Sequence, residues 1–284
     1  MTRDREAGIV LVNVLVILAL TASIVALMFG SRDTARERVS AMSDGALAEA
    51  LALGAEASVI AALRRDLITA PEADHFGEPW ARIAQEETRL ATGRFSVVIR
   101  DQQRKYDINW LAGGRLGPVT TLARLLEELD QPPELAAQIA AILTRVGRVP
   151  ALENLTAFGI PATALEEIAP YVTALPVEGE VNLNTAEAPL MRAMFGNRAI
   201  AARLIAVRAR EGHITRETLT GAGAVRPDHS GFTSNLYAVE VFAEAGVAAV
   251  RLESTILRVA ELSGQSVGVL SRRFMDVYPA AAPE

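Results

Sequence analysis

The side chains that could do chemistry are few in this sequence and lie far apart. Its three histidines are His75, His213 and His229. They form no HExxH pattern, and no nucleophile elbow accompanies them. Cysteine is absent, so the chain has no thiolate nucleophile, no thiolate metal site and no disulfide framework. We therefore interpret the histidines as surface or loop residues and predict a protein that is not an enzyme.

Three acidic residues are weak candidates for metal ligands. Glu178, Glu180 and Asp228 lie in stretches whose composition is typical of loops. A calcium ion needs several hard oxygen ligands, but the sequence has no DxDxDG run that would gather them. Our preferred interpretation of each residue is therefore a solvated acidic loop, and the metal site stays unassigned.

The charge balance argues against a nucleic-acid-binding protein. The chain has 34 acidic and 28 basic residues and a net charge of −6, which gives no electrostatic attraction for phosphates. Half of the residues are hydrophobic and 22% are charged. This composition is typical of a membrane-tethered globular protein and not of a disordered chain.

An uncharged apolar segment near the N-terminus is the most informative element. No charged residue occurs between Glu6 and Arg32. About 20 apolar residues suffice for a helix to span hydrocarbon, so this stretch is long enough. Gly8 comes before the apolar run, whereas a signal peptide has its small cleavage residues beyond a shorter core. The arrangement resembles a type IV pilin leader, cut after Gly8 and then kept as an anchor; a signal anchor that is never cut is the alternative.

The anchor continues into a segment with helical periodicity. Apolar residues between Val39 and Leu67 recur mostly three, four or seven positions apart, and Pro71 ends the pattern. We predict one helix from about Ile9 to Ala70, whose first half suits lipid and whose second half suits packing on a sheet. Two helices with a joint near residues 30–31 are the alternative.

Beyond this helix the patterns predict strands, then helices, then strands again. FSVVIR and KYDIN are typical of two short strands with DQQR as the turn between them. Several helices follow, and the tail alternates apolar and polar residues as in an antiparallel sheet. The simplest packing is α+β, with a helical domain (116–230) inserted into a domain formed by residues 31–115 and 231–284.

Three segments in this order resemble the K-type minor pseudopilin of type II secretion (general secretion pathway protein K). They are the leader and anchor around Gly8-Ile9, the stretch that ends in VNLNTAEAPLMRAM, and the strand-rich tail from Phe232. KYDINWLAGG looks like a degraded form of a further family segment. The resemblance implies a pilin-like fold, with a long N-terminal helix packed on an antiparallel sheet and an inserted all-helical domain.

The resemblance also implies how the N-terminus is processed. A prepilin peptidase would remove residues 1–8, and Ile9 would become N-methylated. Counted from Ile9, position five of the processed chain is Asn13. This position is a glutamate in most pilins, but K-type pseudopilins lack that glutamate. Its absence suits a subunit at the tip of the pilus, which has no neighbouring subunit above it. The alternative is that Asn13 is an incidental polar residue. Two features depart from the usual pattern: Ile9 replaces phenylalanine, and the leader has no net charge.

The NLNTAE segment has a local interpretation and a functional one. Asn184 could cap a helix that begins at Thr185, with Glu187 completing a capping box, while Asn182 bonds the turn backbone. The functional alternative is a membrane-anchored helix-hairpin-helix protein for DNA binding or uptake, because such proteins carry a similar sequence before their hairpins. The hairpins here lack a clear Gly-x-Gly phosphate loop, and residues 151–213 carry a net negative charge.

A K-type pseudopilin is an assembly subunit, and the resemblance implies its surroundings. The chain would be held in the inner membrane by residues 9–30, with residues 31–284 in the periplasm. It would bind the I-type and J-type minor pseudopilins and the inner-membrane assembly platform, and it would start and cap a pseudopilus that exports folded proteins across the outer membrane. No cofactor is required; calcium, which is associated with the family's helical domain, is possible.

Overall fold

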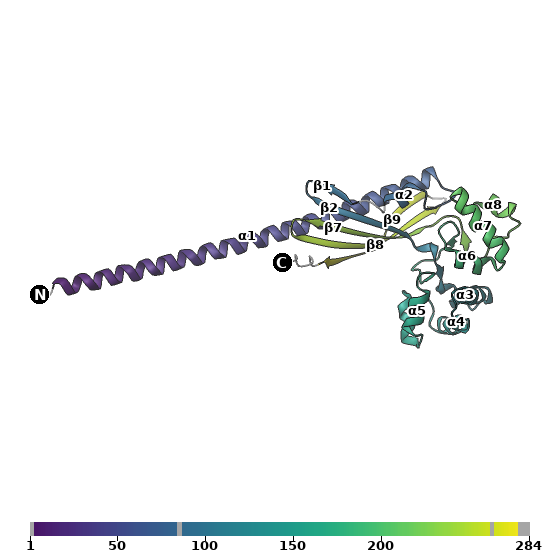
Figure 1. The fold of residues 1–284 in the computed structure, drawn as a ribbon, viewed down its shortest axis with the longest axis horizontal. Coiled ribbons are helices and arrows are strands. Elements are labelled where there is room, and N and C mark those ends of the chain that lie inside the picture. Colours follow the sequence, from purple (N-terminus) through teal and green to yellow (C-terminus); the bar gives the residue numbers. More distant parts are fainter. Residues whose placement is uncertain (1–2, 84–86, 262–263, 278–284) are drawn as a thin grey trace.

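The computed structural model describes residues 3–83, 87–261 and 264–277 (Figure 1). A single helix of 67 residues, α1 (Arg3–Thr69), begins far from the rest of the molecule and ends against a sheet. Pro71 follows it, since proline lacks the N–H that a continuing helix needs. The prediction of one helix without a joint near residue 30 is confirmed.

The C-terminal third of α1 is amphipathic and covers one face of the sheet. Its buried residues recur every three or four positions: Ala48, Ala52, Ala55, Val59, Leu63 and Leu67. The three alanines have small side chains, which suit a close approach of the helix to the strands, and the larger residues complete the core. A short helix, α2 (Pro79–Arg82), brings Trp80 into the same core.

The sheet is antiparallel and built from both ends of the chain. Its order is β1 (Thr88–Leu90), β2 (Gly93–Asp101), β7 (Leu236–Ala245), β8 (Ala248–Glu261) and β9 (Gly264–Val277). β2 and β7 pair along their whole length, from Arg94 opposite Glu244 to Asp101 opposite Tyr237. The predicted FSVVIR strand and the three predicted tail strands are confirmed.

The predicted hairpin between FSVVIR and KYDIN is wrong. DQQR is largely a 3-10 turn, η2 (Gln102–Arg104), and only β3 (Tyr106–Asp107) of the second segment is a strand. β3 pairs in parallel with β4 (Val172–Thr173) and not with β2. The Asp107 carboxylate accepts the backbone N–H groups of nearby Asn109 and of distant Leu175, and these two bonds hold β3 beside the segment that contains β4.

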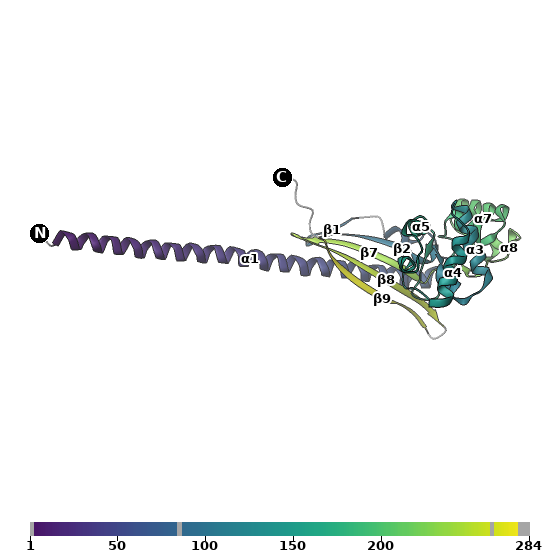
Figure 2. The same cartoon turned by 90° about the horizontal axis from the view of Figure 1, so that it is seen from below.

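A helical insert lies between β2 and β7 and has its own core. Its further elements are η3 (Ile108–Gly113), α3 (Leu116–Glu128), α4 (Glu134–Val146), η4 (Leu152–Phe158), α5 (Ala162–Ile168), β5 (Val181–Asn182), α6 (Ala188–Phe195), α7 (Arg198–Glu211), α8 (Arg216–Gly221) and β6 (Ser230–Gly231). Tyr106, Ile108 and Leu111 already pack in this second core, so the insert begins earlier than the predicted boundary at residue 116. Figures 1 and 2 place it at the end of the molecule opposite to the N-terminus.

Candidate functional site

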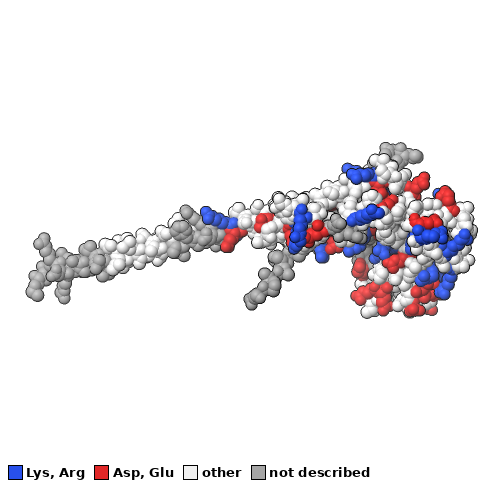
Figure 3. Space-filling model, turned by 45° about the horizontal axis from the view of Figure 1, so that its top comes forward, with Lys and Arg blue, Asp and Glu red and all other residues white. Residues whose placement is uncertain are grey.

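Residues 13–25 of α1 expose an apolar surface. Among the described side chains, residues 13–25 are all exposed, and Leu15, Ile17 and Leu18 are each about 60% accessible. In Figure 3 this part of the helix carries no charged side chain. Removal of each such side chain from water is worth about 1.5–3 kcal/mol. This surface is therefore stable only when lipid or partner helices cover it.

The anchor residues singled out from the sequence lie on this helix. Asn13 is exposed among the apolar side chains. Gly8 and Ile9 are within α1, but their side chains lie outside the described ones. By length and composition, residues 36–69 also qualify as a membrane span, yet much of this segment packs on the sheet; Asn13–Val25 is a shorter apolar helix. The free apolar surface therefore assigns the anchor to the first half of α1.

A buried polar junction joins the helical insert to the sheet domain, and the NLNTAE segment forms half of it. The Asn182 amide donates to the Asp74 carbonyl (3.0 Å), to Asp101 Oδ2 (3.2 Å) and to Ser234 Oγ (2.8 Å). Thr185 Oγ1 and Ser234 Oγ also donate to Asp101 Oδ2. Asn182 and Asp101 are almost fully buried, so these bonds replace water completely.

The predicted helix cap is wrong, although the predicted turn is confirmed. Asn182 Oδ1 accepts the Asn184 N–H at 2.9 Å, which fixes the turn. Helix α6 begins only at Ala188 with Glu187 as its N-cap residue, and Glu187 makes an ion pair with Arg104 in place of a capping box. Asn184 Oδ1 accepts the Ile214 N–H at 2.7 Å instead. These side chains serve long-range contacts, which a local motif does not predict.

The second half of the junction is a buried arginine among carboxylates. Arg258 of β8 donates to Asp66 Oδ2 at 2.9 Å, to Asp74 and to the Ser234 carbonyl at 3.0 Å. Glu78 lies beside them and accepts Trp80 Nε1–H at 2.8 Å. Burial raises the pKa of Asp66 to about 7, and the neighbouring Glu78 and Asp74 carboxylates act in the same direction. Burial also raises the pKa of Glu78.

The residues predicted as weak metal candidates do not form a common site. Glu180 pairs with Arg226 at 3.3 Å, and Glu178, Glu180 and Asp228 are not grouped within ligand distance in the described part of the chain. Oxygens of Asp66, Asp74 and Glu78 do lie within 4.8 Å of one another. However, Arg258 already bonds two of these three carboxylates and supplies the positive charge there. Calcium binding therefore stays a prediction without assigned ligands.

The histidines make stacking contacts. His75 of the sheet domain stacks on His213 of the insert with ring centroids 4.8 Å apart, and His229 stacks on Trp110 at 4.6 Å. The sequence 264–268 reads Gly-x-Ser-x-Gly, but it lies inside strand β9 and not at a strand-to-helix turn. The contacts of the histidines and the position of this serine within a strand therefore favour a structural role over a catalytic one.

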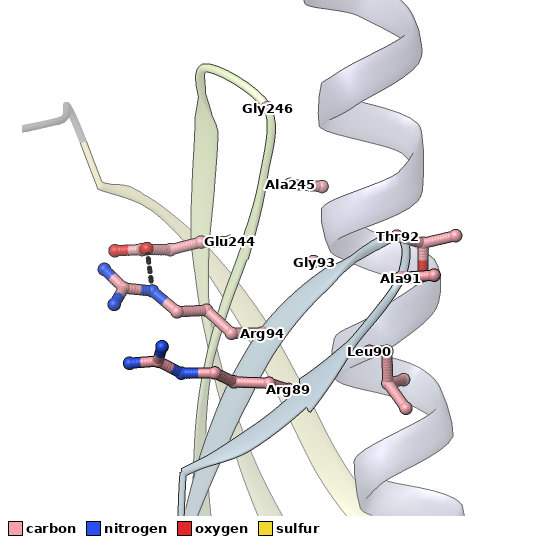
Figure 4. Close-up of a pocket in the computed structure, with 9 residues that line it drawn as sticks. All are labelled: Arg89, Leu90, Ala91, Thr92, Gly93, Arg94, Glu244, Ala245 and Gly246. Carbon is pink, nitrogen blue, oxygen red and sulfur yellow. Dashed lines mark hydrogen bonds and ion pairs between the residues drawn. The ribbon is translucent and has the colours of Figure 1, made fainter.

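A hollow of about 470 Å³ lies at the end of the sheet, between the turns that follow β1 and β7 (Figure 4). Arg94 and Glu244 form an ion pair along its side, with Arg89 nearby. Gly93 and Gly246 lie at the turns, where the Glu244 carbonyl and the Asp44 carboxylate, respectively, leave little room for a side chain. The hollow is open and offers arginines and one carboxylate, so it is a groove at the sheet edge without an acid–base pair.

Taken together, the exposed apolar helix and the antiparallel sheet that it covers define a pilin-like subunit, here with a helical insert between β2 and β7. The family model for "Type II secretion system (T2SS), protein K" matches residues 181–240, a range that contains the junction motif and β7. The chain is 27% identical to type II secretion system protein K of Pseudomonas aeruginosa, over 77% of each chain. It is 25% identical to protein K of Pectobacterium carotovorum, over 96% of this chain and 97% of the relative.

A solved structure has the same fold. The match is to the crystal structure of the GspK–GspI–GspJ complex from enterotoxigenic Escherichia coli, with a TM-score of 0.61, 20% identity, and coverage of 86% of this chain and 100% of the other. The predicted resemblance to the K-type pseudopilin is therefore confirmed. The comparisons give no support to the DNA-binding alternative.

Proposed function

We infer that this chain is a minor pseudopilin of a type II secretion system. The observation that carries the inference is the combination of a free apolar helix with a sheet domain that bears a large helical insert at the far end. Relatives named type II secretion system protein K are similar to this chain over most of its length. The chain acts as an assembly subunit and not as an enzyme.

The N-terminus is the part that the secretion machinery would process. A prepilin peptidase cleaves after Gly8 and leaves Ile9 as the first, N-methylated residue. The helix from Ile9 to Gly30 then holds the chain in the inner membrane, with residues 31–284 in the periplasm. The uncharged surface of residues 13–25 supports a membrane position, because water would leave its apolar side chains unburied.

The position of this subunit in the pseudopilus follows from the N-terminal helix and from the helical insert at the opposite end of the molecule. Asn13 has no charge to pair with the terminal amine of a subunit stacked above, so the helix does not recruit one. The insert occupies the end of the molecule opposite to the anchor (Figure 2), where it blocks further addition. The chain therefore starts and caps the pseudopilus, in contact with the inner-membrane assembly platform. Calcium, where bound, would be held by ligands of the helical insert.

The partners are the I-type and J-type minor pseudopilins of the same system. A K-type protein with the same fold was crystallised with proteins named GspI and GspJ, which supports this proposal. When the full chain is co-expressed with both partners and purified through a tag, native mass spectrometry should detect a complex with one copy of each. A matched sample without the J-type partner should lose the three-protein species.

Two results would contradict the proposed function. One is recovery of the chain alone from membranes that contain both partners. The other is a three-protein complex that forms equally well when an unrelated membrane-anchored protein replaces this chain.

A further inference from the structure

The junction between the two domains contains more buried negative charge than positive charge. Four of its carboxyl groups, those of Asp66, Asp74, Glu78 and Asp101, are at most 5% exposed. Among the described residues that contact this cluster, Arg258 is the buried cation, and it is 4% exposed. Four ionised carboxylates beside one guanidinium would leave several uncompensated charges out of water, which is strongly unfavourable.

Hydrogen bonding separates Asp101 from the other three acids. Asp101 Oδ1 accepts the Gln103 N–H, and its Oδ2 accepts donors from Asn182, Thr185 and Ser234, so this carboxylate is well solvated by the protein. By contrast, Asp74 Oδ1 and Glu78 Oε1 are buried and have no hydrogen-bond donor in the described part of the chain. A buried acceptor left in this state costs roughly 1–3 kcal/mol.

A proton shared among these carboxyl groups supplies a hydrogen-bond donor to the unpaired oxygens and also removes one of the buried negative charges. Oxygens of Asp66, Asp74 and Glu78 lie within 4.8 Å of one another, and the Asp66 and Asp74 side chains are in hydrogen-bonding contact, so a proton on Asp66 can be donated to Asp74. A metal ion fits less well, since it would be placed beside the guanidinium of Arg258, which already bonds Asp66 and Asp74.

We propose that Asp66, Asp74 and Glu78 share one proton, and that this proton tightens the docking of the helical insert on the sheet domain. The cluster is connected to the insert directly. Asp74 Oδ2 accepts the Ser234 N–H at 2.6 Å, and the Asp74 carbonyl accepts the Asn182 amide. Asp74 N–H also donates to the Phe232 carbonyl at 2.9 Å. Repulsion that displaces Asp74 therefore loosens the insert at Asn182 and at its C-terminal end, where Phe232 and Ser234 lie.

The direction of the pH effect follows from the raised pKa of the buried acids. Burial holds the pKa of Asp66 near 7, against 3.8 for the free side chain. The docked state therefore binds a proton that the open state releases, and docking is strongest at acid pH. Between about pH 4 and 7 the opening equilibrium rises by about tenfold per pH unit, and above pH 7 it levels off.

The other ionisable groups that face the cluster act with Asp66 or stay in one charge state in this range, except for His75. Glu78 and Asp101 have raised pKa values through burial and act with Asp66. Tyr237 of β7 has its pKa raised well above 10, so it stays neutral in this range. Arg258 stays charged. His75, next to Asp74, has its pKa lowered by burial first and by His213 second, so its protonation at acid pH opposes the effect of the shared proton.

The test is hydrogen exchange of the full chain in detergent micelles between pH 5 and 8.5, corrected for the intrinsic exchange rates. Protection of the amides of Asp74 and Ser234 should fall by about tenfold per pH unit from pH 5 to 7 and then stay constant. Asp66→Asn mimics the neutral acid and should keep the acid-side protection at pH 8. Asp130→Asn is the matched control, because Asp130 is exposed on the insert, and it should behave as the parent chain does.

Infrared spectroscopy provides a second readout, which detects the shared proton directly in the unsubstituted chain and assigns it with variants. The carboxylic acid C=O band of a buried acid should be present at pH 5.5 and lost at pH 8.5, and it should be missing from Asp66→Asn. Protection that is equal at pH 5 and 8, or an acid band unaffected by both Asp66→Asn and Glu78→Gln, would overturn the proposal. Stabilisation at pH 8 by millimolar calcium or magnesium would overturn it in favour of a bound cation.

Discussion

Replacement of Arg258 by methionine should lower the free energy of unfolding by about 3–5 kcal/mol at pH 7.5. The methionine fills much of the same volume but leaves Asp66 and Asp74 buried without their guanidinium partner. It also removes the donor to the Ser234 carbonyl at the start of β7. Urea denaturation of the full chain in detergent, followed by tryptophan fluorescence, measures this change.

The matched control is Arg273→Met on the neighbouring strand β9. Arg273 pairs with Glu253 at 2.7 Å, but its side chain is 71% exposed, and solvent screens such pairs. We expect a loss of no more than about 1 kcal/mol. Equal losses for the two variants would contradict the account, because they would mean that burial of the charges at the junction is unimportant.

Replacement of Trp80 by alanine should have an effect of similar size, about 3–5 kcal/mol. Trp80 is 1% exposed and packs edge-on against Tyr237 with ring centroids 5.3 Å apart. Its removal leaves a cavity between α1 and the sheet and takes a hydrogen-bond donor from Glu78. The thermal unfolding midpoint, recorded by far-ultraviolet circular dichroism, measures the loss.

Two further variants separate packing from hydrogen bonding at this position. Trp80→Phe keeps most of the ring but leaves Glu78 without the indole N–H, so about 1–3 kcal/mol should be lost. Phe76→Ala removes a neighbouring ring that is 54% exposed, and the loss should be less than 1 kcal/mol, about the value for a surface substitution. If Phe76→Ala were as damaging as Trp80→Ala, the core would not be centred on Trp80.

The elements that depend on local patterns were predictable from the sequence. The uncharged segment after Glu6 and the apolar stripe up to Leu67 predicted a single long helix, and the structure has one. Alternation in the tail predicted β7, β8 and β9; in β7 and β8 alternate residues are buried on the face that α1 covers. The position of the insert between strands followed from the order of these patterns.

The junction was not predictable, because its contacts join distant positions. The Asn182 amide meets partners 108, 81 and 52 residues away along the chain. A single sequence offers no signal for such pairings, and the local capping interpretation of NLNTAE was therefore incorrect. The parallel pairing of β3 with β4, which replaced the predicted hairpin, was missed for the same reason. The one feature of the sequence that pointed to the junction was the high number of acidic residues from Asp66 to Glu78, just before Trp80.

The central claim is that this chain is processed and assembled as a pseudopilin, and its intact mass tests that claim most directly. The full chain should be extracted from membranes of cells that carry a prepilin peptidase and compared with chain from cells that lack the enzyme. The account predicts a mass that begins at Ile9 and includes one added methyl group, only in the presence of the peptidase. A chain that retains Met1 in both preparations, or one cut beyond Gly30, would contradict it.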